Sequence, residues 1–104
     1  MTTLLVAFDG ADDRDTEELR RYYREEHAPL VAALPHLEAY EVTFPSDPDR
    51  APWDGVATLR FPDRAAFRTA MDSEAAAAME ADAANFVAEG SLHQLVGDTE
   101  PLLD

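Results

Sequence analysis

The feature that most constrains the fold is the order in which two kinds of hydrophobic pattern follow each other along the chain. Short apolar or alternating runs, typical of β-strands, occupy residues 3–8, 37–44, 54–61 and 91–96. Helical patterns lie between the first and second runs and between the third and fourth. This order predicts an α+β fold, a ferredoxin-like β-α-β-β-α-β domain with a four-stranded antiparallel sheet and both helices on one face.

Capping residues mark where the helices begin. Asp15 followed by Glu18 predicts a capping box at the start of the first helix. Asp63 and Ser73 predict N-caps for two further helical segments, and the second of these is very rich in alanine and extends to about residue 87. The second helix of the domain is therefore expected in two pieces.

Length and composition restrict the class of protein. A chain of 104 residues predicts one domain over residues 1–104. The absence of cysteine excludes disulfides and thiolate chemistry. No apolar run approaches the ~18 residues of a membrane span, and no basic region precedes the first apolar run as in a secretory signal. We therefore expect a cytoplasmic protein.

The charge balance is strongly acidic, with 22 Asp and Glu against 8 basic residues and a net charge of −14. Such a surface repels nucleic acids and anionic membranes, so neither is an expected partner. An acidic surface for a cationic partner and adaptation to high salt both explain this balance. Because the acids are scattered and lysine is absent, a halophilic source is favoured.

The best candidate for chemistry is a histidine on the apolar stripe of the first helix. The stripe consists of Leu19, Tyr23, His27, Leu30 and Leu34, at spacings of four, four, three and four. An imidazole with a pKa near neutrality can serve as a general acid or base. The alternative is a core or rim histidine that makes one hydrogen bond.

A proline two residues after this histidine favours the functional interpretation. Pro29 should clash with the carbonyl of Glu25 and push Ala28 away from helical angles. The helix is therefore expected to kink or pause just after His27, which opens space beside the imidazole. Pro35 marks the expected end of the helix.

Aromatic residues provide candidates for a substrate pocket around His27. Tyr22 or Tyr23 could bind substrate or tune the imidazole, and Trp53 beside a proline-rich loop could act as a lid. Core or rim packing explains each of these aromatic residues equally well. The candidate substrate-binding residues are Tyr22, Tyr23, Tyr40, Trp53, Phe61 and Phe86.

Neither a metal site nor a dinucleotide site is expected. His27, His36 and His93 lie far apart, and no pair of histidines has ligand spacing. No G-x-G-x-x-G motif follows a strand, so no bound cofactor is expected. A sheet covered by helices on one face leaves the other face bare, and we expect a homodimer that pairs the two sheets face to face.

The order and spacing of these residues resemble a known family. The segments YYREEHAPLVAALPHLEAY and DGVATLRFPDRAAFRTAMDSEAAAAMEADAANFVAEGSLHQLVGD are similar to the EthD family of small dimeric α+β-barrel proteins. The resemblance covers residues 4–98. The matching positions are Tyr22, Tyr23, His27, Pro29, Pro35, Tyr40, Phe61, Pro62, Asp63, Asn85, Phe86, Val96 and Gly97.

The resemblance implies a dimeric α+β barrel with a pocket between the sheet and the helices of each protomer. The family carries an oxidoreductase label, and similar barrels include cofactor-free monooxygenases, isomerases, cyclases and haem-degrading enzymes. The first hypothesis is an enzyme that acts on a hydrophobic small molecule with His27 as acid–base and no cofactor. The alternatives are a non-catalytic ligand-binding or accessory protein of a degradation pathway, and a purely structural dimer.

Overall fold

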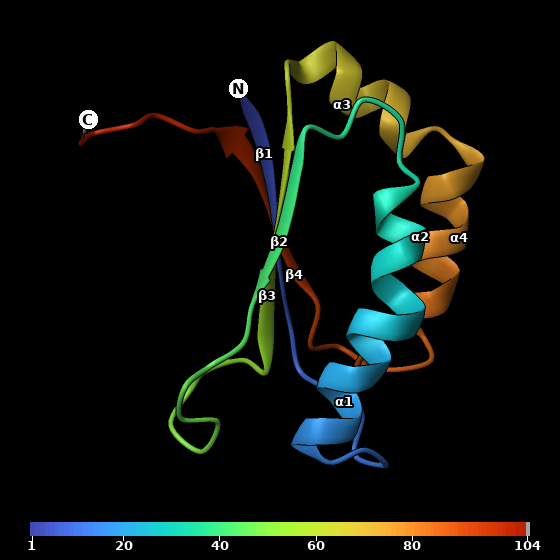
Figure 1. The fold of residues 1–104 in the computed structure, drawn as a ribbon, viewed down its shortest axis with the longest axis vertical. Helices are drawn as coiled ribbons and strands as arrows, with labels where there is room; N and C mark the ends of the chain where they lie inside the picture. The colour runs from blue at the N-terminus through green and yellow to red at the C-terminus, as the bar shows by residue number, and fades with distance from the viewer. Residues whose placement is uncertain (104) are drawn as a thin grey trace.

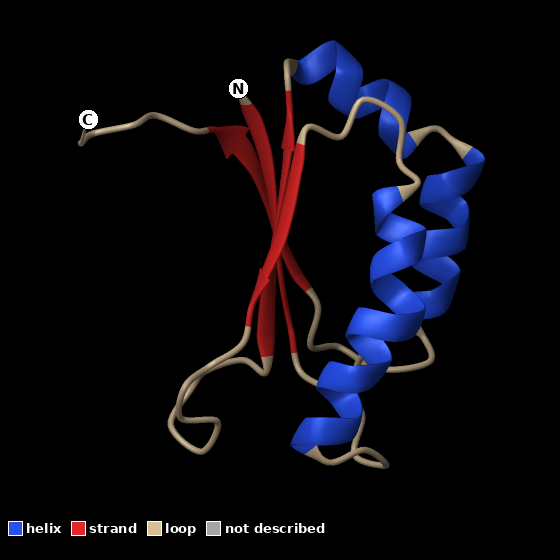
Figure 2. Cartoon of the chain, in the orientation of Figure 1, coloured by secondary structure: helices blue, strands red, loops and turns tan. Residues whose placement is uncertain are grey.

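A computed structural model describes residues 1–103, and its backbone forms two layers. One layer is an antiparallel sheet with the strand order β2-β3-β1-β4, and all the helices cover the same face of it (Figures 1 and 2). The strands are β1 (Thr2–Phe8), β2 (Ala39–Thr43), β3 (Gly55–Phe61) and β4 (His93–Asp98). This arrangement confirms the predicted ferredoxin-like α+β fold.

The helical layer contains one long helix and a second helix in two pieces. The long helix consists of α1 (Thr16–Tyr22), the π-helical turn η1 (Tyr23–His27) and α2 (Ala28–Ala32). The two pieces are α3 (Arg64–Met71) and α4 (Glu74–Ala83), and α4 packs beside α2 (Figure 1). The predicted N-caps are confirmed: Asp15, Asp63 and Ser73 each accept a hydrogen bond from a backbone N–H in the first turn.

Two boundaries predicted near the end of the domain were wrong. Helix α4 ends at Ala83 rather than near residue 87, and β4 covers residues 93–98 rather than 91–96. The backbone after α4 bonds instead to the segment that follows β1: Phe86 C=O accepts from Ala11 N–H at 2.8 Å, and Ala88 N–H donates to Asp9 C=O at 2.8 Å. These tertiary hydrogen bonds outweigh the local helix propensity of the sequence.

The predicted disturbance beside His27 is present, but its form differs from the expectation. Ala28 stays helical, with φ −55° and ψ −40°, and its N–H donates to the carbonyl of Tyr23, five residues back. The expectation that Pro29 moves Ala28 out of helical angles was therefore wrong. The π turn takes up the disturbance because the wider turn relieves the close approach of the proline ring to the preceding carbonyls.

The buried stripe of the long helix follows the π turn. Leu19, Tyr23, His27, Val31 and Leu34 are buried. Val31 takes the place predicted for Leu30, which is half-buried. The stripe thus keeps a spacing of four through His27, so that the imidazole faces the sheet.

Strand register separates the two faces of the sheet. Leu4 pairs with Leu59 and with Val96, and Val6 pairs with Ala57, so these side chains share the face under the helices. The opposite face carries Leu5, Thr58 and Leu95, which the register also places side by side. Leu95 is 62% exposed on this open face. No helix within residues 1–103 is long and apolar enough to cross a membrane.

Candidate active site

An apolar cavity of about 310 Å³ lies between the helices and the sheet. Strands β1, β3 and β4 form its floor, and the long helix, α3, α4 and the segment after α4 form its walls and roof. The side chains that line it are Leu4, Val6, Phe8, Tyr23, His27, Val31, Ala57, Leu59, Phe67, Met71, Met79, Glu80, Ala83, Phe86, Val87, Leu92 and Gln94. A cavity of this size and polarity suits a small hydrophobic ligand.

His27 and Tyr23 are the buried titratable side chains of the described lining, and of these two only the imidazole has an ordinary pKa near neutrality. His27 is 7% exposed, and its ring lies 4.6 Å from the ring of Phe86 and 5.2 Å from that of Tyr23, measured between centroids. Its Nδ1 lies 2.9 Å from Asp82 Oδ2. No other group within residues 1–103 forms a hydrogen bond with the imidazole, so Nε2 is the ring atom available to a ligand in the cavity.

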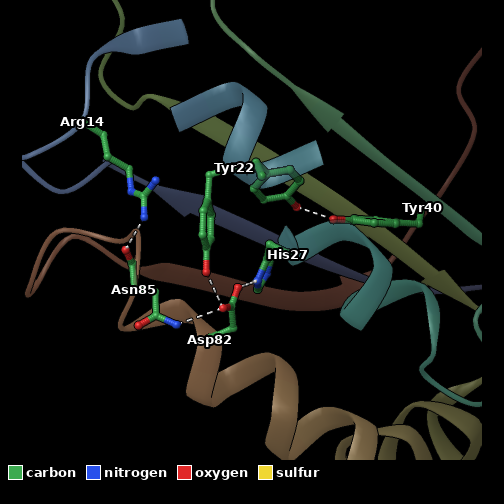
Figure 3. Close-up of polar contacts among 7 residues, drawn as sticks. Arg14, Tyr22, His27, Tyr40, Asp82 and Asn85 are labelled. Carbon is green, nitrogen blue, oxygen red and sulfur yellow. Dashed lines mark hydrogen bonds and ion pairs between the residues drawn. The ribbon is translucent and has the colours of Figure 1, made fainter. Parts of the chain in front are cut away.

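Asp82, on α4, joins His27 to a polar network at the edge of the cavity (Figure 3). Its Oδ2 faces the imidazole, and its Oδ1 accepts from the Tyr22 hydroxyl at 2.6 Å and from Asn85 Nδ2 at 3.0 Å. The guanidinium of Arg14 lies over the ring of Tyr22, 4.1 Å from its centroid, and donates to the Asn85 carbonyl at 3.4 Å. The carboxylate is therefore held by donors on both of its oxygens.

The surroundings shift the protonation equilibria of this pair. Burial lowers the pKa of His27 below its usual value, although the hydrogen bond to Asp82 and its charge act in the opposite direction. Burial raises the pKa of Asp82, but the hydrogen bonds from Tyr22, Asn85 and His27 outweigh it and leave the pKa low. Near neutral pH the pair therefore consists of a neutral imidazole and an ionised carboxylate.

Tyr23 and Tyr40 form a second polar pair, and their hydroxyl oxygens lie 2.5 Å apart (Figure 3). Tyr23 lines the cavity and stacks on Phe8 with 5.6 Å between ring centroids. Burial raises the pKa of both tyrosines. The two hydroxyls share one hydrogen bond, in which one O–H donates and the other oxygen accepts.

The remaining predicted site residues are distributed over different parts of the fold. Phe86 lines the cavity against His27, whereas Tyr22 acts beside it through Asp82. Phe61 is fully buried and contacts the cavity wall through Phe67, at 5.5 Å between ring centroids. Trp53 lies outside the cavity lining, 37% exposed, with its ring 6.1 Å from that of His93.

Sequence reasoning missed Asp82 as a partner of the candidate acid–base. A usable signal was present, because Asp82 lies three residues after Met79 and four before Phe86, both on the apolar stripe of this segment. A carboxylate within such a stripe needs a buried partner. Nothing in the sequence identifies His27 as that partner, since 55 residues separate the two.

Within the described part of the chain, no three His, Asp or Glu side chains lie close enough together to hold a metal ion. The chemistry that this arrangement supports is proton transfer at Nε2 of His27 in a largely apolar cavity.

The fold and the site together define a ferredoxin-like α+β protein with an apolar cavity and a buried histidine–aspartate pair. A family model for the EthD domain matches residues 11–90, and the chain belongs to this family. A search of curated proteins by sequence found no match.

Solved structures of similar fold include an EthD family protein from Bacillus halodurans C-125. It is 22% identical, with a TM-score of 0.82 over 96% of this chain and 99% of that one. A dimeric ferredoxin-like protein from Thermobifida fusca is 16% identical, with a TM-score of 0.70 over 94% and 90%. A putative antibiotic biosynthesis monooxygenase from Nitrosomonas europaea is 15% identical, with a TM-score of 0.67 over 95% and 98%.

Proposed function

We propose that this protein is a small homodimeric enzyme that transfers protons on a hydrophobic small molecule, with Nε2 of His27 as the acid–base and no cofactor. The observation that carries the proposal is the placement of the imidazole, which is held by Asp82 at Nδ1 and lines an apolar cavity with its other nitrogen free. Proton abstraction of this kind initiates isomerisation, cyclisation and cofactor-free oxidation. The oxidoreductase label of the family and the isomerase or cyclase alternative are both compatible with this first step.

The roles of the surrounding residues follow from their contacts. Asp82 orients His27 and stabilises the imidazolium that forms when Nε2 accepts a proton. Tyr22 supports Asp82, and Phe86 and Tyr23 provide apolar surface for the ligand beside the imidazole. Burial keeps His27 neutral near pH 7, which is the protonation state that a general base requires.

A ring-opening reaction tests this proposal without knowledge of the natural substrate. In 5-nitrobenzisoxazole, a base removes the C3 proton, the C–H electron pair completes the nitrile, and the N–O bond breaks to give a phenolate that absorbs light. The protein is expected to accelerate this reaction, and His27→Ala should lower the rate by about 10²-fold. The control is His36→Asn, which changes an exposed histidine in a turn and should leave the rate unchanged. Equal rates for wild type and His27→Ala would refute the catalytic role.

A non-catalytic ligand-binding protein is the second candidate, because most of the cavity lining is hydrocarbon and can hold a ligand without His27. This function predicts that an apolar ligand binds equally well to wild type and His27→Ala, while neither protein accelerates the ring opening. The homodimer in this proposal is supported by the exposed leucine on the open sheet face and by the description of the Thermobifida fusca protein as dimeric.

A further inference from the structure

The Asp82 network determines which nitrogen of His27 carries the hydrogen. An ionised carboxylate offers only acceptor oxygens, so the group that faces Asp82 Oδ2 at 2.9 Å must be a donor. Nδ1 of the imidazole therefore holds the hydrogen. In a neutral imidazole with Nδ1–H, the other nitrogen has a lone pair and no hydrogen. Nε2 thus presents a hydrogen-bond acceptor to the cavity.

Apart from His27, the buried lining contains one polar side chain, Tyr23. Its hydroxyl oxygen lies 2.5 Å from that of Tyr40. Burial raises the pKa of Tyr23, and so does the hydrogen bond between the two hydroxyls, as expected when Tyr23 is the donor. The Tyr23 oxygen then has only acceptor capacity left for a ligand. Glu80 and Gln94 are exposed and lie where α4 and β4 border the cavity. The other lining side chains are hydrocarbon, aromatic or thioether groups. A ligand with one polar group therefore meets acceptors and no donor among the buried side chains of an apolar cavity, where an unpaired group is costly.

We infer that the cavity selects neutral aromatic or enolic molecules that carry a hydroxyl group, and that it discriminates against molecules of the same shape that offer only an acceptor. This inference rests on the proposed function, since the hydroxyl hydrogen that the ligand donates to Nε2 is the proton that His27 would remove as the base. A ketone or ether oxygen would place its lone pairs against the lone pair of Nε2. The aromatic rings of Phe8, Tyr23 and Phe86 favour a flat ligand beside the imidazole.

Matched ligands test the selection directly. We would titrate the protein with 2-naphthol, with 2-methylnaphthalene, in which a methyl group replaces the hydroxyl, and with 2-acetylnaphthalene, which offers only a carbonyl. Near neutral pH the naphthol is expected to bind about tenfold more tightly than the hydrocarbon, as the gain of one well-placed hydrogen bond predicts. Affinities of the naphthol and the hydrocarbon within about twofold, or a preference for the ketone, would overturn the inference.

The variant Asp82→Asn should invert the preference. Tyr22 and Asn85 both donate to Oδ1, so the amide oxygen keeps that position and the amide NH₂ faces His27. The NH₂ group then donates to Nδ1, and the imidazole hydrogen moves to Nε2. The ketone should now bind more tightly than the naphthol, whereas Glu89→Gln, which neutralises an exposed carboxylate elsewhere, should keep the wild-type order. If Asp82→Asn still binds the naphthol more tightly than the ketone, the assignment of the imidazole hydrogen to Nδ1 is refuted. Binding of the hydrocarbon by this variant shows that its cavity is intact.

Nitrogen-15 NMR of the imidazole of the wild-type protein keeps the inference testable if Asp82→Asn fails to fold. A hydrogen on Nδ1 and an unprotonated Nε2 are expected, and the opposite tautomer would overturn the inference. The outcome is separable from that of the proposed function. Binding of the naphthol over the hydrocarbon without any ring-opening activity supports selection and refutes catalysis. Ring-opening activity that is lost in His27→Ala, together with equal binding of the naphthol and the hydrocarbon, supports catalysis and refutes selection.

Discussion

The variant Asp82→Ala should destabilise the fold by about 1.5 kcal/mol, because it removes the acceptor of three donors. Asn85 is exposed and the Tyr22 hydroxyl is only partly buried, so both can bond to water instead. His27 is 7% exposed, and an unsatisfied buried donor costs about 1–3 kcal/mol. The higher helix propensity of alanine returns roughly 0.5 kcal/mol.

Urea unfolding followed by circular dichroism measures this loss, and a thermal scan should show Tm lower by roughly 6–12 °C for a domain of this size. Glu89→Ala is the matched control, because it removes the same charge from an exposed site. Its free energy of unfolding should stay within about 0.5 kcal/mol of wild type. A similarly small loss for Asp82→Ala would refute the reasoning that this network stabilises the fold.

A double-mutant cycle with His27→Phe assigns the loss to the right pair. Phenylalanine keeps an aromatic ring beside Phe86 but has no donor for Asp82. If the cost of Asp82→Ala arises mainly at the imidazole, the two changes should be non-additive, with a coupling of about 1 kcal/mol or more. Additive losses would place the cost at Tyr22 or Asn85 instead.

Three further predictions concern pH, assembly and packing. Because the pKa of His27 is lower in the folded than in the unfolded chain, its contribution to stability is fully present above the unfolded pKa of about 6.5 and is lost as pH falls through the folded pKa. Acidification from neutrality should therefore lower the urea midpoint less in His27→Phe than in wild type. Leu95→Asp puts a charge on the open sheet face and should convert a dimer to a monomer in sedimentation, whereas an unchanged mass would contradict the sheet-to-sheet dimer. Gly55→Ala should cost about 1–3 kcal/mol in urea unfolding, because its Cβ would lie 2.7 Å from the ring of Phe8, and wild-type stability would show that this contact yields.

The fold could be predicted from the sequence because its signals are local. The cap residues Asp15, Asp63 and Ser73 each act within one helical turn, and each lies where it was expected. The alternating run at residues 37–44 likewise contains β2, whose register puts Tyr40 and Val42 on the helix side of the sheet. The boundaries that failed, at Ala83 and at β4, lie where hydrogen bonds to residues 9–11 compete with local propensity.

The candidate site was less accessible because its contacts are distant in sequence. His27 could be singled out from its helical stripe, and the structure places it at the cavity. Trp53 was grouped with it only as an aromatic residue near a proline-rich loop, whereas its ring lies beside that of His93 on β4. The sequence position of Asp82 indicates that a carboxylate lies on the apolar side of α4. Only the packing of α4 against the long helix brings this carboxylate to Nδ1 of His27.

The π turn connects the local sequence to the site. Four residues advance about 400° along an α-helix, so a stripe repeated every four residues drifts about 40° per turn away from the sheet. The wider turn over Tyr23–His27 takes up this drift, and Leu19, Tyr23, His27 and Val31 are all buried as a result. Pro29 lies just beyond this turn: it has no N–H for the carbonyl of Glu25, and its ring would clash with that carbonyl in a regular α-helix, which the wider turn relieves. The π turn thus contributes to the site through the backbone, because it keeps the imidazole on the side of the helix that meets both Asp82 and the cavity.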